Sequence, residues 1–299
     1  ALSSSPSMLA SFPRYCRTLA MNSVARPRPR RWTTQLFNRT HRIAYDHDML
    51  LDPPQAIHAE VRLKSGAKLL ELLYSIDHRE RDGRRLYRGQ ADAKWCLTPR
   101  LFRDEDATNV DVLKAFERRF LNSLRNTLRH GTAAPERLLD NDDYLLSLAQ
   151  HYGGLTRCLD WTASPLQATY FAAAESVTSR CERDLCVFTT SSFRCRRSLN
   201  DDGSRLLNSP AADNHHIRAQ NGELVLHGWS DRNHWPDRAI EAEPEDLSTI
   251  LRARVAKLRV PSKASAWLVD QLRYRGIDGS RTYDGTRGYV QLAFEQAMM

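Results

Sequence analysis

The sequence predicts an α+β fold with a single main domain, in which helices flank a mixed or mainly antiparallel sheet. Two observations lead to this prediction: amphipathic helical segments cluster in the first half of the chain, and short strand-like segments recur mainly in the second half. A regular alternation of strands and helices is not evident. Hydrophobic residues make up 41% of the 299 residues, which is enough to form a substantial core.

The first helix and the first strand are predicted before residue 91. The segment SGAKLLELLYSIDHRER has apolar residues at helical spacing and begins at Ser65, which can cap a helix. The segment RRLYRGQ that follows has the pattern of a short strand. We expect Gly89 to let the backbone turn out of this strand.

Two more helices are predicted between residues 109 and 152. From Asn109, apolar residues recur at helical spacing through NVDVLKAFERRFLNSLRNTLRH, and the pattern stops before Gly131. The shorter helix DYLLSLAQHY ends at Gly153 and Gly154, which favour a helix C-terminus and would leave His151 at the exposed end.

The second half of the chain contains most of the predicted strands. The segment LTRCLDWTA is either a strand or an extended loop, and Ser164 followed by Pro165 predicts the start of a helix. Further strands are predicted at residues 185–190, 222–229 and 252–260. The segment SKASAWLVDQLRYR then predicts a helix that Ser262 would cap and Gly276 would end.

The positive charge of the chain is concentrated at its N-terminus. Residues 1–45 contain eight arginines, no lysine and no acidic residue, so they account for the whole formal net charge of +8. The remaining chain has 36 basic residues, which is 44 minus 8, and 36 acidic ones. A nucleic-acid partner is therefore expected only if this basic segment provides the contact.

Residues 1–48 are predicted to be a disordered basic leader or an over-extended start, with translation beginning at Met21 or Met49. A mitochondrial transit peptide also fits the many arginines and the missing acidic residues. The six cysteines form no Cys-x-x-Cys pair, and no apolar run approaches the length of a membrane span. We therefore expect a cytoplasmic protein without a membrane partner, or a mitochondrial one if the leader is genuine.

Two segments combine charged and aromatic residues with glycines: LYRGQADAKWCLTPRLFR at residues 86–103 and SLAQHYGGLTRCLDWTASPLQATYFAAA at residues 147–174. They resemble the FRG domain, a mostly bacterial family named for a Phe-Arg-Gly tripeptide, with Tyr87 here in place of the Phe. The resemblance implies an FRG-like domain over residues 65–299, with the strongest match at residues 86–175. It implies no particular reaction, so the function must be inferred from the residues.

Arg88 and Arg157 are candidates for binding an anion. Arg88 lies in the predicted strand with Gln90, and its guanidinium either pairs with a buried carboxylate such as Asp160 or binds a ligand's phosphate or carboxylate. Arg157 and Asp160 are three residues apart and either bridge one another or leave one charge free. A free Asp160 would stabilise a developing oxocarbenium ion or orient a nucleophile.

Other candidate site residues have a structural alternative. His151 is expected to be charged at a helix C-terminus, where it either acts in catalysis or caps the helix. Trp161 and Tyr170 would stack on a nicotinamide or a nucleobase, or pack in the core. Ser164 either contacts the ligand or caps its helix, and Gln220 either binds an amide or ribose hydroxyl or bonds a backbone group.

The order of these motifs is similar to that of arginine-class ADP-ribosyltransferases. Arg88 lies in the Y-R-G strand, Ser164 begins the helix that carries YFA, and Asp284 is the candidate third-motif carboxylate. In the closing block GIDGSRTYDG, the sequence RTYD replaces the usual Phe-Pro-Asp-Leu-Asp pattern of the FRG family, and Glu295 is a poorer substitute for Asp284. The similarity implies NAD as a co-substrate.

The leading hypothesis is an FRG-domain protein that binds a nucleotide or dinucleotide and acts as an ADP-ribosyltransferase-like enzyme. One alternative is a noncatalytic binding module in bacterial defence or mobile-element biology, and another is a nucleic-acid-processing enzyme. The chain has no Gly-rich phosphate loop, no GxSxG and no HExxH motif. The spacing of Cys181, Cys186 and Cys195 with the later pair His215 and His216 is irregular for zinc, so no metal is expected.

Overall fold

The computed structural model describes residues 58–79, 85–103, 109–131, 135–191, 205–207, 222–229, 239–283 and 285–299. The predicted leader, Gln220 and Asp284 lie outside these described residues. Cys195, His215 and His216 of the weak zinc pattern also lie outside them.

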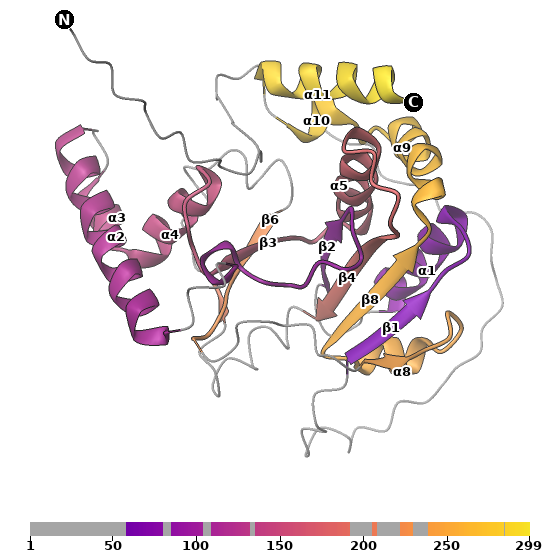
Figure 1. Ribbon diagram of the computed structural model, residues 1–299, viewed down its shortest axis with the longest axis horizontal. Coiled ribbons are helices and arrows are strands. Elements are labelled where there is room, and N and C mark those ends of the chain that lie inside the picture. Colours follow the sequence, from indigo (N-terminus) through magenta and orange to yellow (C-terminus); the bar gives the residue numbers. More distant parts are fainter. Residues whose placement is uncertain are drawn as a thin grey trace, which may run out of the picture.

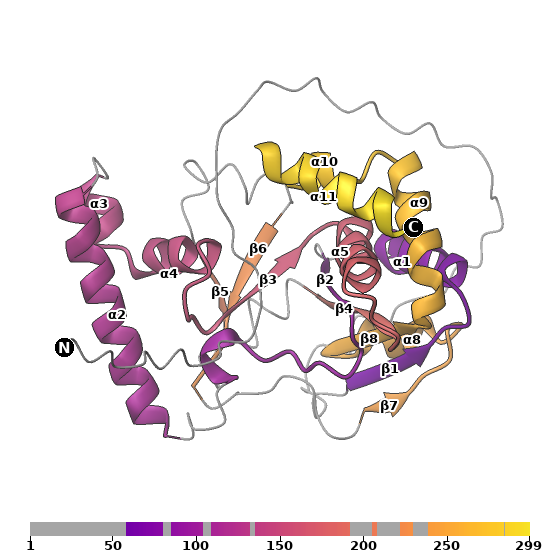
Figure 2. The same ribbon diagram turned by 45° about the horizontal axis from the view of Figure 1, so that its top comes forward.

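The described residues form an eight-stranded mixed sheet in the order β5-β6-β3-β2-β4-β8-β1-β7 (Figures 1 and 2). The strands are β1 (His58–Arg62), β2 (Arg85–Gln90), β3 (Cys158–Thr162), β4 (Leu185–Ser191), β5 (Arg205–Leu206), β6 (Gly222–Leu226), β7 (Ile240–Glu241) and β8 (Val255–Val260). β1 runs parallel to β7 and β8, and the other neighbouring strands are antiparallel. The predicted α+β class and mixed sheet are confirmed.

Helices pack in two groups. The helices are α1 (Gly66–Arg79), α2 (Val110–Gly131), α3 (Glu136–Leu139), α4 (Asp142–His151), α5 (Pro165–Thr178), α8 (Leu247–Arg252), α9 (Ser265–Tyr274), α10 (Gly279–Thr282) and α11 (Gly285–Met298), with 3-10 turns η1 (Arg100–Phe102) and η3 (Ser262–Ala264). α1, α5 and α9 contact one another and share the main hydrophobic core with β2, β4 and β8. α2, α3 and α4 pack together on the opposite side of the molecule (Figure 2).

Local signals in the sequence set most helix ends. The hydroxyl of Ser164 accepts a hydrogen bond from the backbone N–H of Gln167 at 3.2 Å, which confirms its role as the cap of α5. Gly153 and Gly276 have φ of +75° and +78°, as expected for helix stops. The predicted cap at Ser262 is wrong, because its hydroxyl donates to the backbone oxygen of Glu182 and η3 precedes α9.

Gly89 has a different role from the one predicted. It lies inside β2 and does not turn the chain, since β2 pairs with β4 from Arg85 to Gln90. A Cβ at Gly89 would lie 1.9 Å from the backbone oxygen of Ala168 in α5. The glycine is therefore needed because the backbone of α5 packs directly on the backbone of β2.

The short strands were not evident in the sequence. β1 precedes residue 65, the predicted start of the domain, and pairs with β8 along its five residues. β5 and β7 have two residues each. Strands this short carry too few residues for an alternating pattern, so pairing with longer neighbours determines them.

Candidate functional site

Strands β2 and β3 meet at a single register pair within the described residues, Tyr87 with Thr162. Arg88 follows Tyr87, and its Nη1 donates a hydrogen bond to the backbone oxygen of Asp160 at 2.6 Å. The Arg88 guanidinium therefore bonds β2 to β3 next to the one pair of residues, Tyr87 and Thr162, at which the two strands are in register. We call this place the β2–β3 fork.

Arg103 is electrostatically coupled to four other charged residues, and we call the five together the fork cluster: Arg88, Arg100, Arg103, Asp160 and Glu175. Burial lowers the pKa of Arg103, and the charges of Arg88 and Arg100 lower it further, while Asp160 and Glu175 raise it. Burial also lowers the pKa of Arg88, and the same two carboxylates oppose that shift. Each guanidinium is thus influenced by charges from several elements.

The arginines of the fork cluster donate to backbone oxygens. Arg88 binds the oxygen of Asp160, Arg100 binds that of Gly153, and Nε of Arg103 donates to Thr98 at 3.0 Å. Nε of Arg88 is buried and has no hydrogen-bond partner in the described part of the chain. No ion pair among the described residues includes a member of the fork cluster. Their charges are consequently not neutralised by direct contact.

The carboxylate of Asp160 is exposed and is bound by a neutral amide. Nε2 of Gln150 in α4 donates to Oδ2 of Asp160 at 2.7 Å, and Oε1 of the same amide accepts from the hydroxyl of Thr156. The Thr156 hydroxyl also accepts from the backbone N–H of Cys158 at 3.2 Å. This chain of bonds holds Asp160 in place without an ion pair to its carboxylate.

Of the two alternatives for Arg157 and Asp160, the structure shows the one in which they do not bridge one another and only one of them is paired internally. Nε of Arg157 donates to both carboxylate oxygens of Glu117 in α2 at 3.0 Å, and Nη1 donates to the backbone oxygen of His227 at 2.5 Å. The guanidinium also lies 4.6 Å from the ring centre of Trp229. Burial raises the pKa of Glu117, while the Arg157 charge lowers it. Asp160 is thus the exposed charge of the two, and Arg157 is paired internally.

Tyr170 packs in the core and offers no face to a ligand in this structure. Its side chain is completely buried between α5 and α11, and its hydroxyl donates to the carboxylate of Glu295. Core packing is therefore the role that the structure gives this ring. Glu295 is also completely buried, which removes it as a substitute for Asp284.

The remaining predicted residues differ in burial and in their contacts. Trp161 in β3 is 6% exposed, and Gln90 in β2 is 5% exposed. The indole N–H of Trp161 and Oε1 of Gln90 have no hydrogen-bond partner in the described part of the chain. His151 is half-buried at the end of α4, and its ring meets Tyr152 edge-on at 4.9 Å. Ser164 caps α5, as described above.

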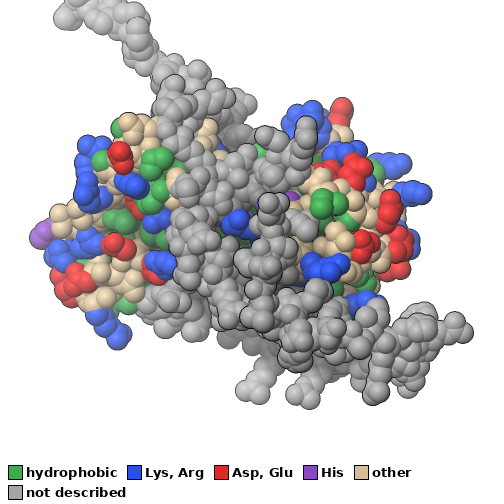
Figure 3. Space-filling view, turned by 90° about the horizontal axis from the view of Figure 1, so that it is seen from below, with side chains coloured by type: hydrophobic (Ala, Val, Ile, Leu, Met, Phe, Trp, Pro, Cys, Tyr) green, Lys and Arg blue, Asp and Glu red, His purple; other side chains and the backbone are tan. Residues whose placement is uncertain are grey.

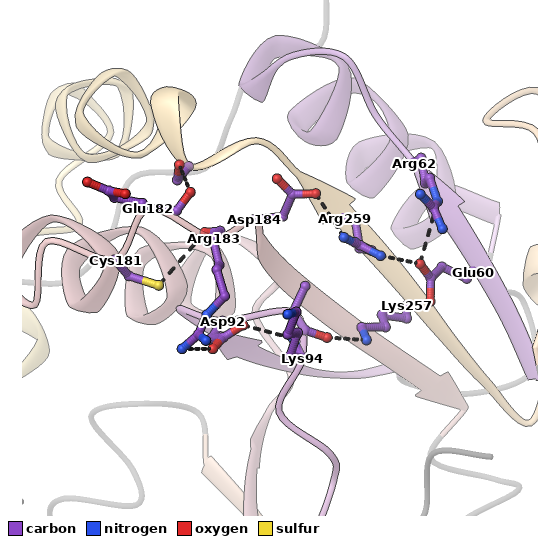
Figure 4. A network of polar contacts seen from close by, with 12 residues as sticks. Glu60, Arg62, Asp92, Lys94, Cys181, Glu182, Arg183, Asp184, Lys257 and Arg259 are labelled. Atoms are coloured by element: carbon purple, nitrogen blue, oxygen red, sulfur yellow. Dashed lines mark hydrogen bonds and ion pairs between the residues drawn. The ribbon is translucent and has the colours of Figure 1, made fainter. Parts of the chain in front are cut away.

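Polar contacts hold the loop that follows β2 (Figure 4). Asp92 is almost completely buried and forms an ion pair with Arg183 at 2.6 Å. The buried ammonium of Lys257 in β8 donates to the backbone oxygen of Ala93. Arg259 of β8 binds carboxylates of β1 and of the turn before β4. The segment that leads from Arg88 to Arg103 is therefore anchored by residues far away in the sequence.

A groove of about 510 Å³ lies away from the fork, between α2, the start of α4 and Trp229. Its lining includes Lys114, Arg118 and Asn122, and it includes no member of the fork cluster. On the face shown in Figure 3, basic and acidic side chains are interspersed on both sides of the molecule. Among the described residues of that face, no large patch carries charges of a single sign.

Sequence reasoning located Arg88 and Asp160, which the structure brings together. It missed Arg100, Arg103 and Glu175, although the first two stand in the LTPRLFR segment and the third directly follows YFAAA. Repetition of arginine in a segment that resembles a family motif was the available signal for two of them. Nothing local marks Glu175, because only the packing of α5 on β2 brings it to the fork.

Two further properties concern only the described residues. They contain no group of three or more His, Cys, Asp or Glu side chains placed to hold a metal ion. They also include no helix with the length and apolar character that a membrane crossing requires.

Comparison with known families identifies the central part of the chain. The model of the FRG domain matches residues 83–181, which include β2, β3, α2 to α5 and every member of the fork cluster. Comparisons with curated proteins and with solved structures gave no match. The matched segment carries both sequence motifs and the site that they build, so this part of the chain is similar to the FRG domain.

Proposed function

We propose that the FRG domain binds a nucleotide or dinucleotide through its phosphate groups at the fork cluster. One observation carries this proposal: the guanidinium groups of Arg88 and Arg100 are electrostatically coupled to that of Arg103, and all three donate to backbone oxygens without a direct ion pair among the described residues. The planar, forked donors of arginine match the oxygens of a phosphate. Three arginines against two carboxylates also leave an excess positive charge that an anion would offset.

The reaction we propose is ADP-ribosyl transfer, with NAD as the co-substrate. In this reaction the bond between the ribose and nicotinamide breaks, its electron pair leaves with nicotinamide, and a nucleophile then bonds to the sugar carbon. The exposed carboxylate of Asp160 would stabilise the positive charge that develops on the sugar. Its bond from Gln150 supports this role, since a neutral partner orients the carboxylate without neutralising it.

A noncatalytic binding module is the second candidate, and a specific contact favours it. Arg88 already joins β2 to β3 by its bond to the backbone oxygen of Asp160. In this alternative the bond stabilises the domain, and the partner binds elsewhere. The two candidates differ in whether the wild-type protein binds and cleaves NAD.

Binding is tested by isothermal titration of NAD and ADP into the wild type, Arg88→Lys and Arg103→Ala. Each variant should bind about tenfold more weakly or worse, because a hydrogen bond to a charged group contributes about 1.5 to 3 kcal/mol. Arg137→Ala is the matched control, since Arg137 is exposed on α3 and outside the fork cluster. Equal affinities in all four proteins, or no binding by the wild type, would contradict the proposal.

Turnover is tested by the release of labelled nicotinamide from NAD, with water as the acceptor. Asp160→Asn should lower the rate, because an amide cannot stabilise a sugar cation, while its side chain can still bond to Gln150. Arg88→Ala should also lower it. Wild-type release no greater than that of Arg88→Ala excludes the transferase and leaves the noncatalytic candidate. The unfolding midpoint of each variant separates loss of activity from loss of structure.

A further inference from the structure

The groove beside α2 is bounded by one face of that helix, by the start of α4 and by Trp229, and we call it the α2 groove. Its volume is about 510 Å³, which lies within the range of about 300 to 1,000 Å³ typical of small-molecule sites. Its lining residues Lys114, Arg118, Leu121 and Arg125 are spaced by three or four positions, so they form a single stripe along α2. No member of the fork cluster lines this groove, which makes it a separate candidate site.

Trp229 forms a fixed wall of the α2 groove. The guanidinium of Arg157 lies 4.6 Å from the centre of its ring, and Phe102 packs against the ring at an angle of 61° with the ring centres 6.1 Å apart. The Trp229 side chain is still half-buried rather than covered, and it lines the groove together with the apolar side chain of Leu121. The groove therefore offers a flat apolar surface that is already in position for an aromatic ring.

Most of the charges in the wall of the α2 groove are bonded to one another. Arg125 donates to Oδ1 of Asn122 at 2.8 Å and to Oδ1 of Asp142 at 2.5 Å. Glu117 accepts from Arg157 with both of its carboxylate oxygens. These two ion pairs hold the wall in place and leave little charge of their own for a ligand.

Arg118 is the exception in this wall. Its side chain is exposed, and it forms no ion pair or hydrogen bond with the described residues. Lys114 is one helical turn earlier, which places the two Cβ atoms about 5 to 6 Å apart. The ammonium of Lys114 lies 4.0 Å from Asp111, and both of these side chains are largely exposed. The donors of Arg118 are thus available to a ligand, and those of Lys114 are only loosely occupied.

The charge of the α2 groove favours a ligand with a single negative charge. Three cationic and three acidic side chains line the groove, and Arg157, the buried partner of Glu117, adds a fourth cation. One positive charge therefore remains, and a carboxylate would balance it. A phosphate group carries about 1.5 to 2 negative charges and would stand close to the carboxylates of the wall. The forked donors of Arg118 also match the two oxygens of a carboxylate.

We propose that the α2 groove binds a small aromatic monocarboxylate. The ring of this ligand packs on Trp229 and Leu121, and its carboxylate accepts hydrogen bonds from Arg118 and Lys114. This site is distinct from the phosphate site proposed at the fork cluster and does not depend on the binding of NAD.

The test is an isothermal titration of indoleacetate, its neutral alcohol tryptophol and indoxyl phosphate into the full chain. The wild type should bind indoleacetate about tenfold more tightly than tryptophol, because only the carboxylate forms a charge-assisted bond with Arg118. Indoxyl phosphate should bind no more tightly than indoleacetate. Arg118→Ala should weaken the binding of indoleacetate about tenfold and leave that of tryptophol unchanged.

Arg119→Ala is the matched control for Arg118→Ala. Arg119 is the next residue of the same helix, and it is exposed and does not line the groove. The control removes the same charge and should bind indoleacetate as the wild type does. Both replaced side chains are exposed, so both variants are expected to unfold at the wild-type midpoint, which thermal denaturation checks.

Four results would overturn the inference. They are no saturable binding of indoleacetate to the wild type in the millimolar range, equal affinities for indoleacetate and tryptophol, tighter binding of indoxyl phosphate, and equal weakening by Arg118→Ala and Arg119→Ala.

Arg103→Ala separates this site from the fork cluster, and it should bind indoleacetate as the wild type does. If Arg103→Ala weakens this binding and Arg118→Ala does not, the carboxylate binds at the fork cluster. The inference about the α2 groove then fails, while anion binding at the fork cluster stands. The titrations with NAD and ADP decide the fork proposal independently of either outcome.

Discussion

Arg157 and Glu117 form a buried ion pair in which one guanidinium nitrogen is 3.0 Å from each of two carboxylate oxygens. The side chains are only 13% and 10% exposed, and the ring of Trp229 covers the guanidinium. The pair connects the residue before β3 to the middle of α2. It thereby fixes the helical group of α2, α3 and α4 against the sheet.

Replacing Glu117 by Ala should lower the free energy of unfolding by about 3 to 5 kcal/mol, because the Arg157 cation would remain buried without its partner. Urea denaturation measures the change. Glu136→Ala is the control, since its pair with Arg129 is 36% and 58% exposed and should contribute about 1 kcal/mol or less. If both variants lose the same free energy of unfolding, burial does not make the Arg157–Glu117 pair more important for stability than an exposed pair.

Gly89→Ala should destabilise the protein strongly, since the added methyl would meet the backbone of α5 at 1.9 Å. Overpacking against side chains lowers the free energy of unfolding by about 1 to 3 kcal/mol. A helix backbone moves less easily than a side chain, so we expect a loss of about 3 kcal/mol or more. Gly131→Ala provides the comparison, because a Cβ there meets no atom within 4 Å. That variant should be as stable as the wild type or slightly more so. Similar thermal unfolding of both variants would contradict the close approach of α5 to β2.

Cys158 and Cys186 should resist alkylation in the folded protein at pH 8. Burial raises the pKa of each thiol to about 12, so very little reactive thiolate exists at that pH. Of the four cysteines in the described part of the chain, Cys96 and Cys181 are partly exposed and should be modified first. Iodoacetamide labelling followed by peptide mass analysis distinguishes the positions. Modification of Cys158 or Cys186 at the rate measured in urea would show that these strands are open in solution.

Tyr170→Phe should cost about 1 to 3 kcal/mol of stability without changing the affinity for NAD. The hydroxyl donates to buried Glu295, and its removal leaves a carboxylate oxygen without that bond. A ring that stacked on the ligand without this bond would leave the stability unchanged as well, because phenylalanine keeps the aromatic face of tyrosine. Denaturation and NAD titration of the same preparation decide between these roles. Weaker NAD binding with unchanged stability would contradict core packing.

Much of the fold could be predicted because its signals are local. The caps at Asn109 and Ser164 and the stops at Gly153 and Gly276 lie within a few residues of the helix ends that they determine. Apolar periodicity then shows which residues lie between these ends. The role of Gly89 could not be predicted in this way, because the helix backbone that requires it belongs to residues about eighty positions later.

The site was predictable only in part for the same reason. Arg88 and Asp160 stand in recognisable motifs, and the structure brings them together. The partner of Arg157 lies forty residues earlier in α2, whereas the sequence spacing of three offered only Asp160 as a possible partner and left the pairing open. Glu175 and Arg103 reach the fork through packing between elements, which leaves no local pattern in the sequence.

The place of β2 in the sheet sets the smallest piece of this chain that can be expressed alone. The family match stops at residue 181, yet β2 pairs at six positions with β4, which begins at Leu185, and β4 in turn pairs with β8. A fragment trimmed to residues 83–181 would carry the signature tripeptide on an open edge with unpaired backbone groups, which invites aggregation. Recombinant fragments should therefore extend through β8, because β2 depends on β4 and β4 on β8, and both strands lie beyond the matched residues.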